Sequence, residues 1–567
     1  MKLAVCLGTA LLVGLPLAAE AQERPRLILQ ITVDQLRGDL PLRHMSQFGE
    51  GGFRYLLEKG VYYNDAHHAH ANTETVVGHT TLATGAHPAA HGMIGNLWFD
   101  RNLGRTVYNV EDANYKMLSA GAGVNAKTEV DPTQLAAATD GRSPASILTS
   151  TFSDELSIAT QGRAKVFGVS VKDRGAVSMA GHTGKAFWFS KSTGKFVTSS
   201  YYYDDYPGWV KNWNDKDFVQ KYLGTSWELL QPLESYVFKD RDDQPWEPDF
   251  EGFGRVFPHP FSTIDPLAYE NDPYFLTFLT FSPAGDQITA DFAKTLIKAE
   301  ALGEDDVTDY LSVSFSSTYY VGHVFGPSSL EAEDNLLQLD RTLADLLAFV
   351  DAEIGLDKTL IVLSADHGTP EAPGFLRELG KLGGYVSPDQ WDTTAAAERV
   401  RKKFGLTGKL IQGYDHPYLT LSEEVRNAEG VDLSALQTAI SEELNAFEGV
   451  AYAVPSARLI QGSLPDNGLT RTIVNNFNPD RSGDIYVVFD PGWFINDFDG
   501  VAVTVTHGSP WRHDTYVPIV FAGFGLSPQK VSRRVHTVDV AITLSAIAGA
   551  RPPDGAAGNV LAEVVGQ

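Results

Sequence analysis

The sequence predicts an α/β fold, with a mostly parallel central sheet, helices on both faces and inserted cap subdomains. Three observations predict it. Short apolar runs recur along the chain, helical patterns separate them, and two long stretches interrupt this alternation. Strands that alternate with helices are typical of a parallel sheet covered on both faces. A length of 567 residues exceeds one simple core, so a large core with insertions, or two domains, is expected.

The apolar runs are predicted to form buried strands, because they are short, strand-like in composition and bounded by other patterns. They span residues 27–33, 164–171, 310–315 and 359–364, with 485–489 and 517–521 as further candidates. Helices are predicted between them, at residues 76–84, 143–159 and 331–354. The last helix opens with a capping-box pattern, Ser328-x-x-Glu331, and the first ends before Gly85.

The two irregular stretches are predicted to be insertions, since strand-like runs resume after each. The first is rich in Tyr, Trp, Phe and Asp, which suggests a cap over a site. The expected order is core residues 22–185, an aromatic-rich cap at 186–270, core residues 271–370, a second insertion at 371–480 and core residues 481–567.

The N-terminus has the pattern of a secretory signal peptide. Lys2 supplies the positive charge, Leu3–Leu17 the apolar segment, and Ala19-Glu20-Ala21 the cleavage site. The apolar segment is shorter than the roughly 20 residues that span a bilayer, and no later segment is long and apolar enough. Residues 1–21 are therefore expected to be removed, and the mature chain to be periplasmic or secreted.

Cysteine content and charge exclude several classes of function. The single cysteine, Cys6, lies in the signal, so disulfides, thiolate–zinc sites and cysteine nucleophiles are excluded. A net charge of −26 disfavours nucleic-acid binding. A small anionic substrate would need local cations, which points towards metal. Structural calcium is compatible with the acidic composition, but no Asp-x-Asp-x-Asp-Gly loop marks a site.

Polar residues follow the predicted strands. Ligands of open α/β sheets collect beyond the carboxyl ends of the strands, so these residues are candidates for a site. They are Asp34 after the first run, Lys172 and Arg174 after the second, His323 beyond the third, and Asp366 and His367 after the fourth. Near the C-terminus, Thr506-His507-Gly508-Ser509 repeats the His-Gly pattern of His367.

Thr75 is a candidate nucleophile at the N-terminus of the helix over residues 76–84. Free N–H groups and the helix dipole would favour negative charge on its oxygen and on bound phosphate. A simple helix cap is the alternative interpretation.

Lys172 and Arg174 suit a phosphoryl group. If the segment is extended, residues i and i+2 face the same side, while Asp173 faces away. Two converging cations match a doubly charged anion. A solvated basic turn is the alternative. The run His67-His68-Ala69-His70 has no carboxylate at clear spacing and is interpreted as structural.

The order and spacing of the motifs resemble the alkaline phosphatase superfamily and, within it, the phosphate-irrepressible (PafA-type) alkaline phosphatases with a threonine nucleophile. The likeness spans residues 27–550. It is carried by the Asp34 strand end, the run Thr75–Gly85 with His91-Gly92 and Gly95-Asn96, the segment Val171–Arg174, Tyr320-Val-Gly-His323, Ser364–Gly368 and Thr506–Ser509.

The resemblance implies a two-zinc phosphatase that acts on small-molecule phosphate monoesters. One zinc would be held by Asp34, Asp366, His367 and the Thr75 oxygen, and the other by His323, His507 and an aspartate four residues before His323. Thr75 would form a phosphothreonine intermediate that water hydrolyses. Asn96, Lys172 and Arg174 would bind the non-bridging oxygens, and the cationic pair favours monoesters over diesters. A monomer is expected.

One position departs from the family pattern. Tyr319 stands where the resemblance places the zinc-binding aspartate. A phenol, with a reference pKa of about 10 against about 3.9 for Asp, is a reluctant anionic ligand. Three hypotheses follow: a phosphomonoesterase with a perturbed second metal site, a phosphodiesterase of the same superfamily, or a catalytically impaired phosphate-binding relative.

Overall fold

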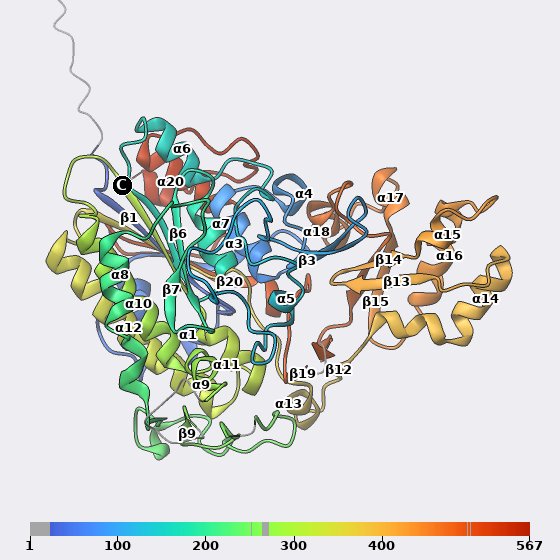
Figure 1. Cartoon of the computed structure of the whole chain (residues 1–567), viewed down its shortest axis with the longest axis horizontal. Coiled ribbons are helices and arrows are strands. Elements are labelled where there is room, and N and C mark those ends of the chain that lie inside the picture. Colours follow the sequence, from blue (N-terminus) through green and yellow to red (C-terminus); the bar gives the residue numbers. More distant parts are fainter. Residues whose placement is uncertain (1–22, 251, 263–271, 496, 499–500, 567) are drawn as a thin grey trace, which may run out of the picture.

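The chain folds around one large sheet. A computed structural model describes residues 23–250, 252–262, 272–495, 497–498 and 501–566. The expected signal peptide, residues 1–21, lies outside the described residues. Ten strands form a mixed, mostly parallel sheet with helices on both sides, which confirms the predicted fold class (Figure 1).

The centre of the sheet consists of four parallel strands. Strand β1 (Leu27–Val33) lies between β10 (Asp309–Phe315) and β11 (Thr359–Ser364), and β5 (Val166–Ser170) pairs with the far side of β10. The sheet continues with β6 (Lys185–Ser190) and β7 (Lys195–Val197) on one side, and with β20 (Tyr516–Gly523), β2 (Val61–His67), β21 (Gln529–Val531) and β22 (Val535–His536) on the other. Strand β20 is antiparallel to both of its neighbours.

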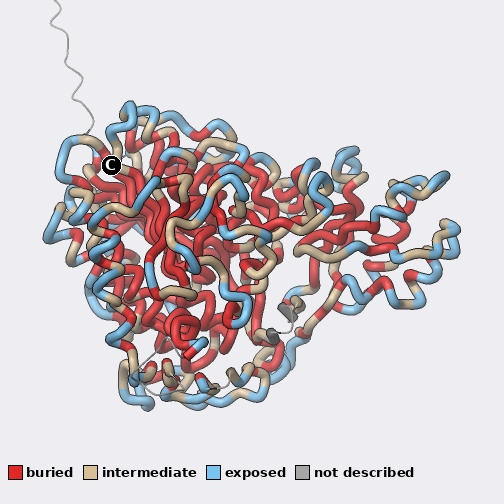
Figure 2. The backbone as a smooth tube through the Cα atoms, in the orientation of Figure 1, coloured by how far each residue is buried: buried red, intermediate tan, exposed pale blue. Residues whose placement is uncertain are grey.

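Both faces of the sheet are buried, so the central strands read as continuous apolar runs. Alternate residues of a strand point to opposite faces. Leu27, Leu29 and Ile31 share one core cluster with helices α10 and α12, whereas Ile28 belongs to a second cluster with α3, α6 and α20. These helices are α10 (Pro283–Ala299), α12 (Leu330–Glu353), α3 (Thr75–Thr84), α6 (Phe152–Ala159) and α20 (Asp539–Ala548). Figure 2 shows the sheet as the densest buried region.

Helix starts differ from the sequence predictions where a different side chain caps the helix. The predicted helix over 143–159 begins only at Phe152, because Thr151 and Asp154 form a capping box. Helix α12 is capped by Ser329, which accepts from the Ala332 N–H, and not by Ser328. Helix α3 ends as expected, with Gly85 in the left-handed conformation at φ 64°.

The range expected to hold the first insertion begins within the sheet. Strands β6 and β7 belong to the main sheet, so the chain leaves it only after Val197. Beyond that point helix α8 (Gly208–Asp215) packs against α10, and a short antiparallel pair forms between β8 (Ser226–Trp227) and β9 (His259–Pro260).

The second insertion has its own sheet and core, on the right of Figure 1. Four antiparallel strands run in the order β13 (Ile411–Asp415), β14 (Tyr418–Leu421), β16 (Ile485–Phe489) and β15 (Val450–Pro455). The expectation that residues 485–489 join the central sheet is therefore wrong. A short apolar run indicates a buried strand but carries no information about which sheet it completes.

Candidate active site and metal centre

The candidate site lies at the carboxyl edge of the four parallel strands. Asp34 follows β1, Asp366 follows β11, Lys172 follows β5, and helix α11 (Ser317–Phe325) follows β10. Because these strands are parallel neighbours, the residues that follow them emerge at one edge. The sheet thus gathers the residues that the sequence singled out.

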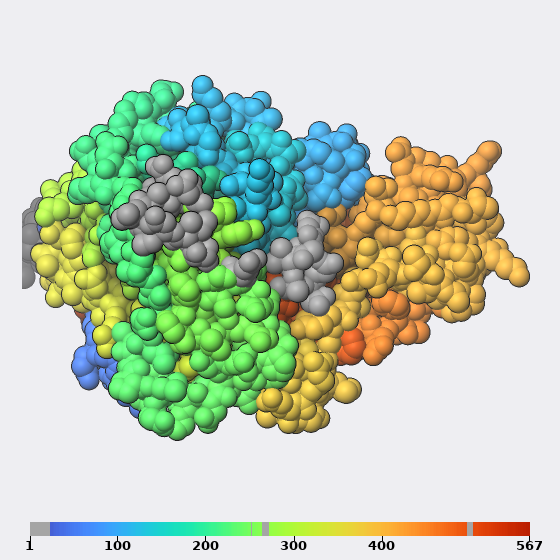
Figure 3. Space-filling model, turned by 60° about the horizontal axis from the view of Figure 1, so that its bottom comes forward, coloured from blue at the N-terminus to red at the C-terminus, as the bar shows by residue number. Residues whose placement is uncertain are grey.

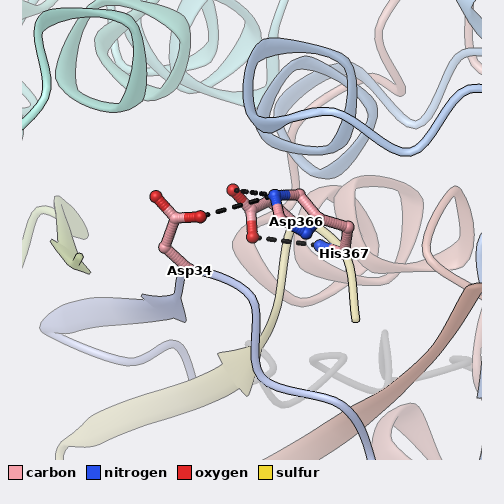
Figure 4. A group of neighbouring side chains, drawn as sticks. All are labelled: Asp34, Asp366 and His367. Atoms are coloured by element: carbon pink, nitrogen blue, oxygen red, sulfur yellow. Dashed lines mark hydrogen bonds and ion pairs between the residues drawn. The ribbon is translucent and has the colours of Figure 1, made fainter. Parts of the chain in front are cut away.

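Asp34, Asp366 and His367 form a group suited to a metal ion. They are buried, and one ligand atom from each lies within 4.8 Å of the other two. Figure 4 shows the three side chains pointing towards one another. His367 Nε2 lies 3.4 Å from Asp34 Oδ1 and 3.6 Å from Asp366 Oδ2. None of these three atoms makes a hydrogen bond of normal geometry, and buried polar atoms of this kind need a partner such as a cation.

The charges in this group are coupled. Burial opposes ionisation of Asp34, but Lys172 and His367 outweigh it and hold the pKa of Asp34 well below its usual value. Burial likewise opposes charge on His367, yet the carboxylates of Asp366 and Asp34 raise the pKa of its imidazole. The carboxylates of Asp34 and Asp366 are therefore balanced by positive charge on His367 and Lys172, a role that a bound cation would also fill.

The three histidines of the site share one orientation. The Nδ1 atom of His367 donates to the Gly368 carbonyl (2.9 Å), that of His323 to Val505 (2.6 Å), and that of His507 to Thr73 (2.8 Å). With its proton on Nδ1, a neutral imidazole offers Nε2 as the ligand atom, and this backbone support is usual for metal-binding histidines. The His367 and His507 rings stack with centroids 3.5 Å apart.

Thr75 is the first residue of α3 and is completely buried. Its Oγ1 lies 3.5 Å from Arg174 Nη2. Asn96 folds back onto the same helix start, where its Oδ1 accepts from the Val76 N–H (3.1 Å), while its own N–H donates to Glu74 Oε2 (2.9 Å). Thr75 and Asn96 are thus brought together, as the sequence predicts.

Gly78 explains how closely helix α3 approaches the candidate metal group. A Cβ atom at this position would lie 1.8 Å from the Asp366 carbonyl oxygen, so only glycine lets α3 pack against that backbone. One turn along the helix, His79 Nδ1 donates to the Thr75 carbonyl (2.9 Å) and lies 3.1 Å from Asp366 Oδ2. Helix α3 therefore fixes Thr75 relative to Asp366.

Lys172 and Arg174 both enter the site, but not from an extended segment. Lys172 directly precedes helix α7 (Asp173–Ala180) and Arg174 lies in its first turn, so the i,i+2 argument from an extended strand is wrong. Asp173 does face away, towards Arg142 Nε (2.5 Å) and the Tyr108 hydroxyl (2.6 Å). Lys172 and Arg174 point into the site, towards Asp34 and Asp131, and Asp173 points away from it.

Each cation has a buried carboxylate partner. Lys172 Nζ lies 2.5 Å from Asp34 Oδ2, and Arg174 Nη1 lies 2.8 Å from Asp131 Oδ2. Burial lowers the pKa of the Lys172 ammonium to about 8, because Asp34 offsets only part of the desolvation. Arg174 stays charged and is held beside the Thr75 hydroxyl.

The residues expected to hold a second metal fit it poorly. His323 and His507 are present, with ring centroids 5.2 Å apart, but the Tyr319 ring packs beside them, 4.1 Å from the His323 centroid and 5.7 Å from that of His507. Burial, followed by the Asp131 carboxylate, raises the pKa of the Tyr319 phenol well above its usual value. Among the described residues, only Asp34, Asp366 and His367 bring three carboxylate or imidazole ligand atoms this close together.

Three residues around the site had no role in the sequence interpretation. His79 could have been noticed, since it lies four residues after Thr75 on the predicted helix. Asp131, which holds Arg174, and Glu74, which holds Asn96, carry no local signal of their function. His67 and His68 bond to Thr515 and to the Ala365 carbonyl, outside the candidate metal group.

The chain matches a family model described as type I phosphodiesterase / nucleotide pyrophosphatase over residues 28–510. It is 34% identical to alkaline phosphatase PhoV of Synechococcus elongatus over 548 residues, which cover 96% of this chain and 93% of PhoV. A Myroides odoratus protein named calcium-transporting ATPase is 34% identical over 559 residues, 97% of this chain and 96% of that one.

A structural match supports the same relationship. Alkaline phosphatase PafA of Elizabethkingia meningoseptica is 32% identical over 551 residues, 96% of each chain. The crystal structure of PafA matches with a TM-score of 0.86 at 31% identity, covering 96% of this chain and all of that chain. No helix within the described parts of the chain is long and apolar enough to cross a membrane. The expected resemblance is confirmed, and the chain belongs to the type I phosphodiesterase / nucleotide pyrophosphatase family within the alkaline phosphatase superfamily.

Proposed function

We propose that this chain is a zinc-dependent, periplasmic or secreted phosphatase that hydrolyses small phosphate monoesters through a phosphothreonine at Thr75. Its relatives establish an enzyme of the alkaline phosphatase class. The observation that carries the specific reaction is the position of Thr75. Its hydroxyl lies at a helix start, beside the Arg174 guanidinium, on the helix that packs against Asp366.

In the first step the Thr75 oxygen attacks phosphorus. The Thr75 hydroxyl gives its proton to solvent, the Thr75 O–P bond forms, the ester P–O bond breaks, and the departing alkoxide takes a proton from solvent. The chemistry that Asp34, Asp366 and His367 would gain from bound zinc is Lewis-acid activation of the Thr75 hydroxyl, which is otherwise a weak nucleophile. Their buried, unpaired ligand atoms fit such an ion.

The phosphoryl oxygens would be held by three groups around Thr75. Arg174 already lies 3.5 Å from its hydroxyl, and Asn96, whose Oδ1 is occupied by the Val76 N–H, offers its amide N–H groups. The Lys172 ammonium, which contacts Asp34, would also contact a phosphoryl oxygen. These donors stabilise negative charge in a water-poor pocket, where electrostatic interactions are stronger than in water. In the second step water displaces the Thr75 oxygen, which releases phosphate and restores the hydroxyl.

The two cations favour monoesters over diesters. A monoester carries more negative charge than a diester at alkaline pH, so Lys172 and Arg174 stabilise it more. Diesterase activity, or phosphate binding without turnover, are the alternatives. The second metal site, at His323 and His507, is proposed to bind metal weakly, because Tyr319 puts a buried, protonated phenol where a carboxylate is expected.

The proposal is tested with nitrophenyl phosphate, bis-nitrophenyl phosphate and the variant Thr75→Ala. We expect hydrolysis of the monoester to dominate, to require zinc and to vanish in Thr75→Ala, while acid quenching of the wild type traps phosphate on Thr75. Mass spectrometry of a peptic digest locates the phosphate. Preference for the diester, or unchanged activity in Thr75→Ala, would overturn the proposal.

A further inference from the structure

A cleft of about 490 Å³ opens beside the candidate nucleophile, between the core and the second insertion. On the core side it is lined by Glu74, Leu97 and Pro132, and on the insertion side by Tyr414, Asp415 and His416. Figure 3 shows the orange surface of the second insertion lying against the blue surface of the N-terminal core segments.

The core wall of the cleft is continuous with the site. Glu74 directly precedes Thr75, Leu97 follows Asn96, and Pro132 follows Asp131, the partner of Arg174. Glu74 Oε2 also accepts from the Asn96 N–H, so this wall contacts the site. We therefore take the cleft as the space for the group that leaves from phosphorus at Thr75. The space lined by Tyr319 and His323, which also lies beside the site, measures about 30 Å³.

We propose that this cleft holds the alcohol part of the substrate and selects phosphate monoesters whose alcohol carries a positive charge, such as an amino alcohol. The inference rests on the proposed monoesterase function and adds a substrate class to it. Asp415 would be the residue that determines specificity.

The charge of the lining supports this selection. Its ionisable side chains include the carboxylates of Glu74, Asp389 and Asp415, and no lysine or arginine. Asp415 accepts hydrogen bonds from the Thr106 hydroxyl at 3.1 and 3.2 Å, and no ion pair joins it to a cation among the described residues. Burial and the neighbouring Glu74 raise the pKa of Asp415 to about 6, so it remains ionised at alkaline pH. A half-buried carboxylate without a counter-ion favours a cationic ligand.

The insertion wall is fixed relative to the nucleophile. His416 Nε2 donates to the Gly508 carbonyl (2.7 Å), next to His507, and its Nδ1 accepts from the Tyr414 hydroxyl (2.7 Å). A Cβ atom at Gly95 would lie 2.9 Å from the His416 carbonyl and 3.1 Å from Glu74 Oε2, so the two walls meet there. The cleft is therefore built into the fold, and the Tyr414 ring adds a surface that suits an ammonium group.

The test compares kcat/KM for phosphoethanolamine with that for ethyl phosphate, a neutral alcohol ester of similar size, and for phosphoglycolate, an anionic one. We expect the order cationic, neutral, anionic. Asp415→Asn should lower the ratio of cationic to neutral substrate about tenfold, the effect of roughly 1.4 kcal/mol. Glu429→Gln, which removes an exposed charge elsewhere on the insertion, should leave the ratio unchanged.

Salt provides a measurement that does not depend on the folding of a variant. In the wild type, added NaCl should reduce the preference for phosphoethanolamine by screening Asp415. A ratio near one in the wild type, or one unmoved by both Asp415→Asn and salt, would overturn the cleft assignment while leaving Thr75-dependent hydrolysis intact. Hydrolysis that persists in Thr75→Ala would instead contradict the proposed function.

Discussion

Lys172 Nζ lies 2.8 Å from the centre of the Tyr319 ring. The same ammonium lies 2.5 Å from Asp34 Oδ2. Lys172 therefore contacts both the candidate metal group and position 319, where the family resemblance places the aspartate of the second metal site. An aromatic face attracts a cation but cannot replace an anionic ligand. An aromatic ring, and no carboxylate, therefore lies beside Lys172 at this position.

Replacing Tyr319 with aspartate should restore a second metal site. Tyr319→Asp removes the ring that stands beside His323 and supplies a carboxylate four residues before it. We expect zinc content, measured by plasma mass spectrometry after dialysis, to rise from near one towards two ions per chain. Tyr319→Phe, which removes only the hydroxyl, is the control and should not gain metal. Two tightly held ions in the wild type would show that Tyr319 is an adequate ligand.

Arg174 should contribute more to monoester than to diester hydrolysis. Arg174→Ala removes charged hydrogen bonds worth about 1.5–3 kcal/mol each, so kcat/KM for nitrophenyl phosphate should fall roughly 10- to 100-fold or more. Arg174→Lys keeps the charge but loses the planar guanidinium, so its kcat/KM should lie between those of Arg174→Ala and the wild type. The bis-ester rate should change much less. Equal losses for both esters would contradict the role in monoester selection.

Gly78→Ala should destabilise the protein or displace helix α3. The added methyl group would lie 1.8 Å from the Asp366 carbonyl oxygen, which is backbone and cannot rotate away. Overpacking of this kind typically costs about 1–3 kcal/mol, and more where the backbone must move. Thermal unfolding measures the effect. Gly208→Ala, where an added Cβ meets nothing within 4 Å, is the matched control and should leave Tm nearly unchanged.

Asp286 should make stability depend on pH. Its Oδ1 accepts from the Ser317 N–H (3.0 Å), and burial raises the pKa of its carboxyl to about 7, from 3.8. Between pH 4 and 7 the Asp286 carboxyl is protonated in the folded chain but ionised in the unfolded chain. The free energy of unfolding therefore falls as pH rises from about 4 to about 7. The maximum contribution is about 4 kcal/mol, at 1.36 kcal/mol per pKa unit.

Asp286→Asn cannot ionise, so the decline in the free energy of unfolding between pH 4 and 7 should be smaller than in the wild type. Urea unfolding at several pH values measures it. The control Glu304→Gln removes an exposed carboxylate and should retain the wild-type slope. An unchanged slope in Asp286→Asn would mean that Asp286 is already ionised in the folded chain.

The sequence determined the local features of this protein. The strand ends that present Asp34 and Asp366 follow from short apolar runs, and the end of helix α3 follows from Gly85 in the left-handed conformation. Placement at the carboxyl edge of a parallel sheet also follows, because parallel neighbours end together. The first features depend on residues close together in the chain, and the last depends on a rule that holds for parallel sheets in general.

Tertiary structure alone decided which residues meet. The pairing of Arg174 with Asp131, the position of the Tyr319 ring against Lys172, and the assignment of residues 485–489 to the smaller sheet depend on segments far apart in the chain. A buried charged side chain needs a partner, and tertiary packing decides which residue that is. Likewise, packing decides which sheet an apolar strand joins. No local pattern encodes either choice, because burial and electrostatics depend on distance in space and not on distance along the chain.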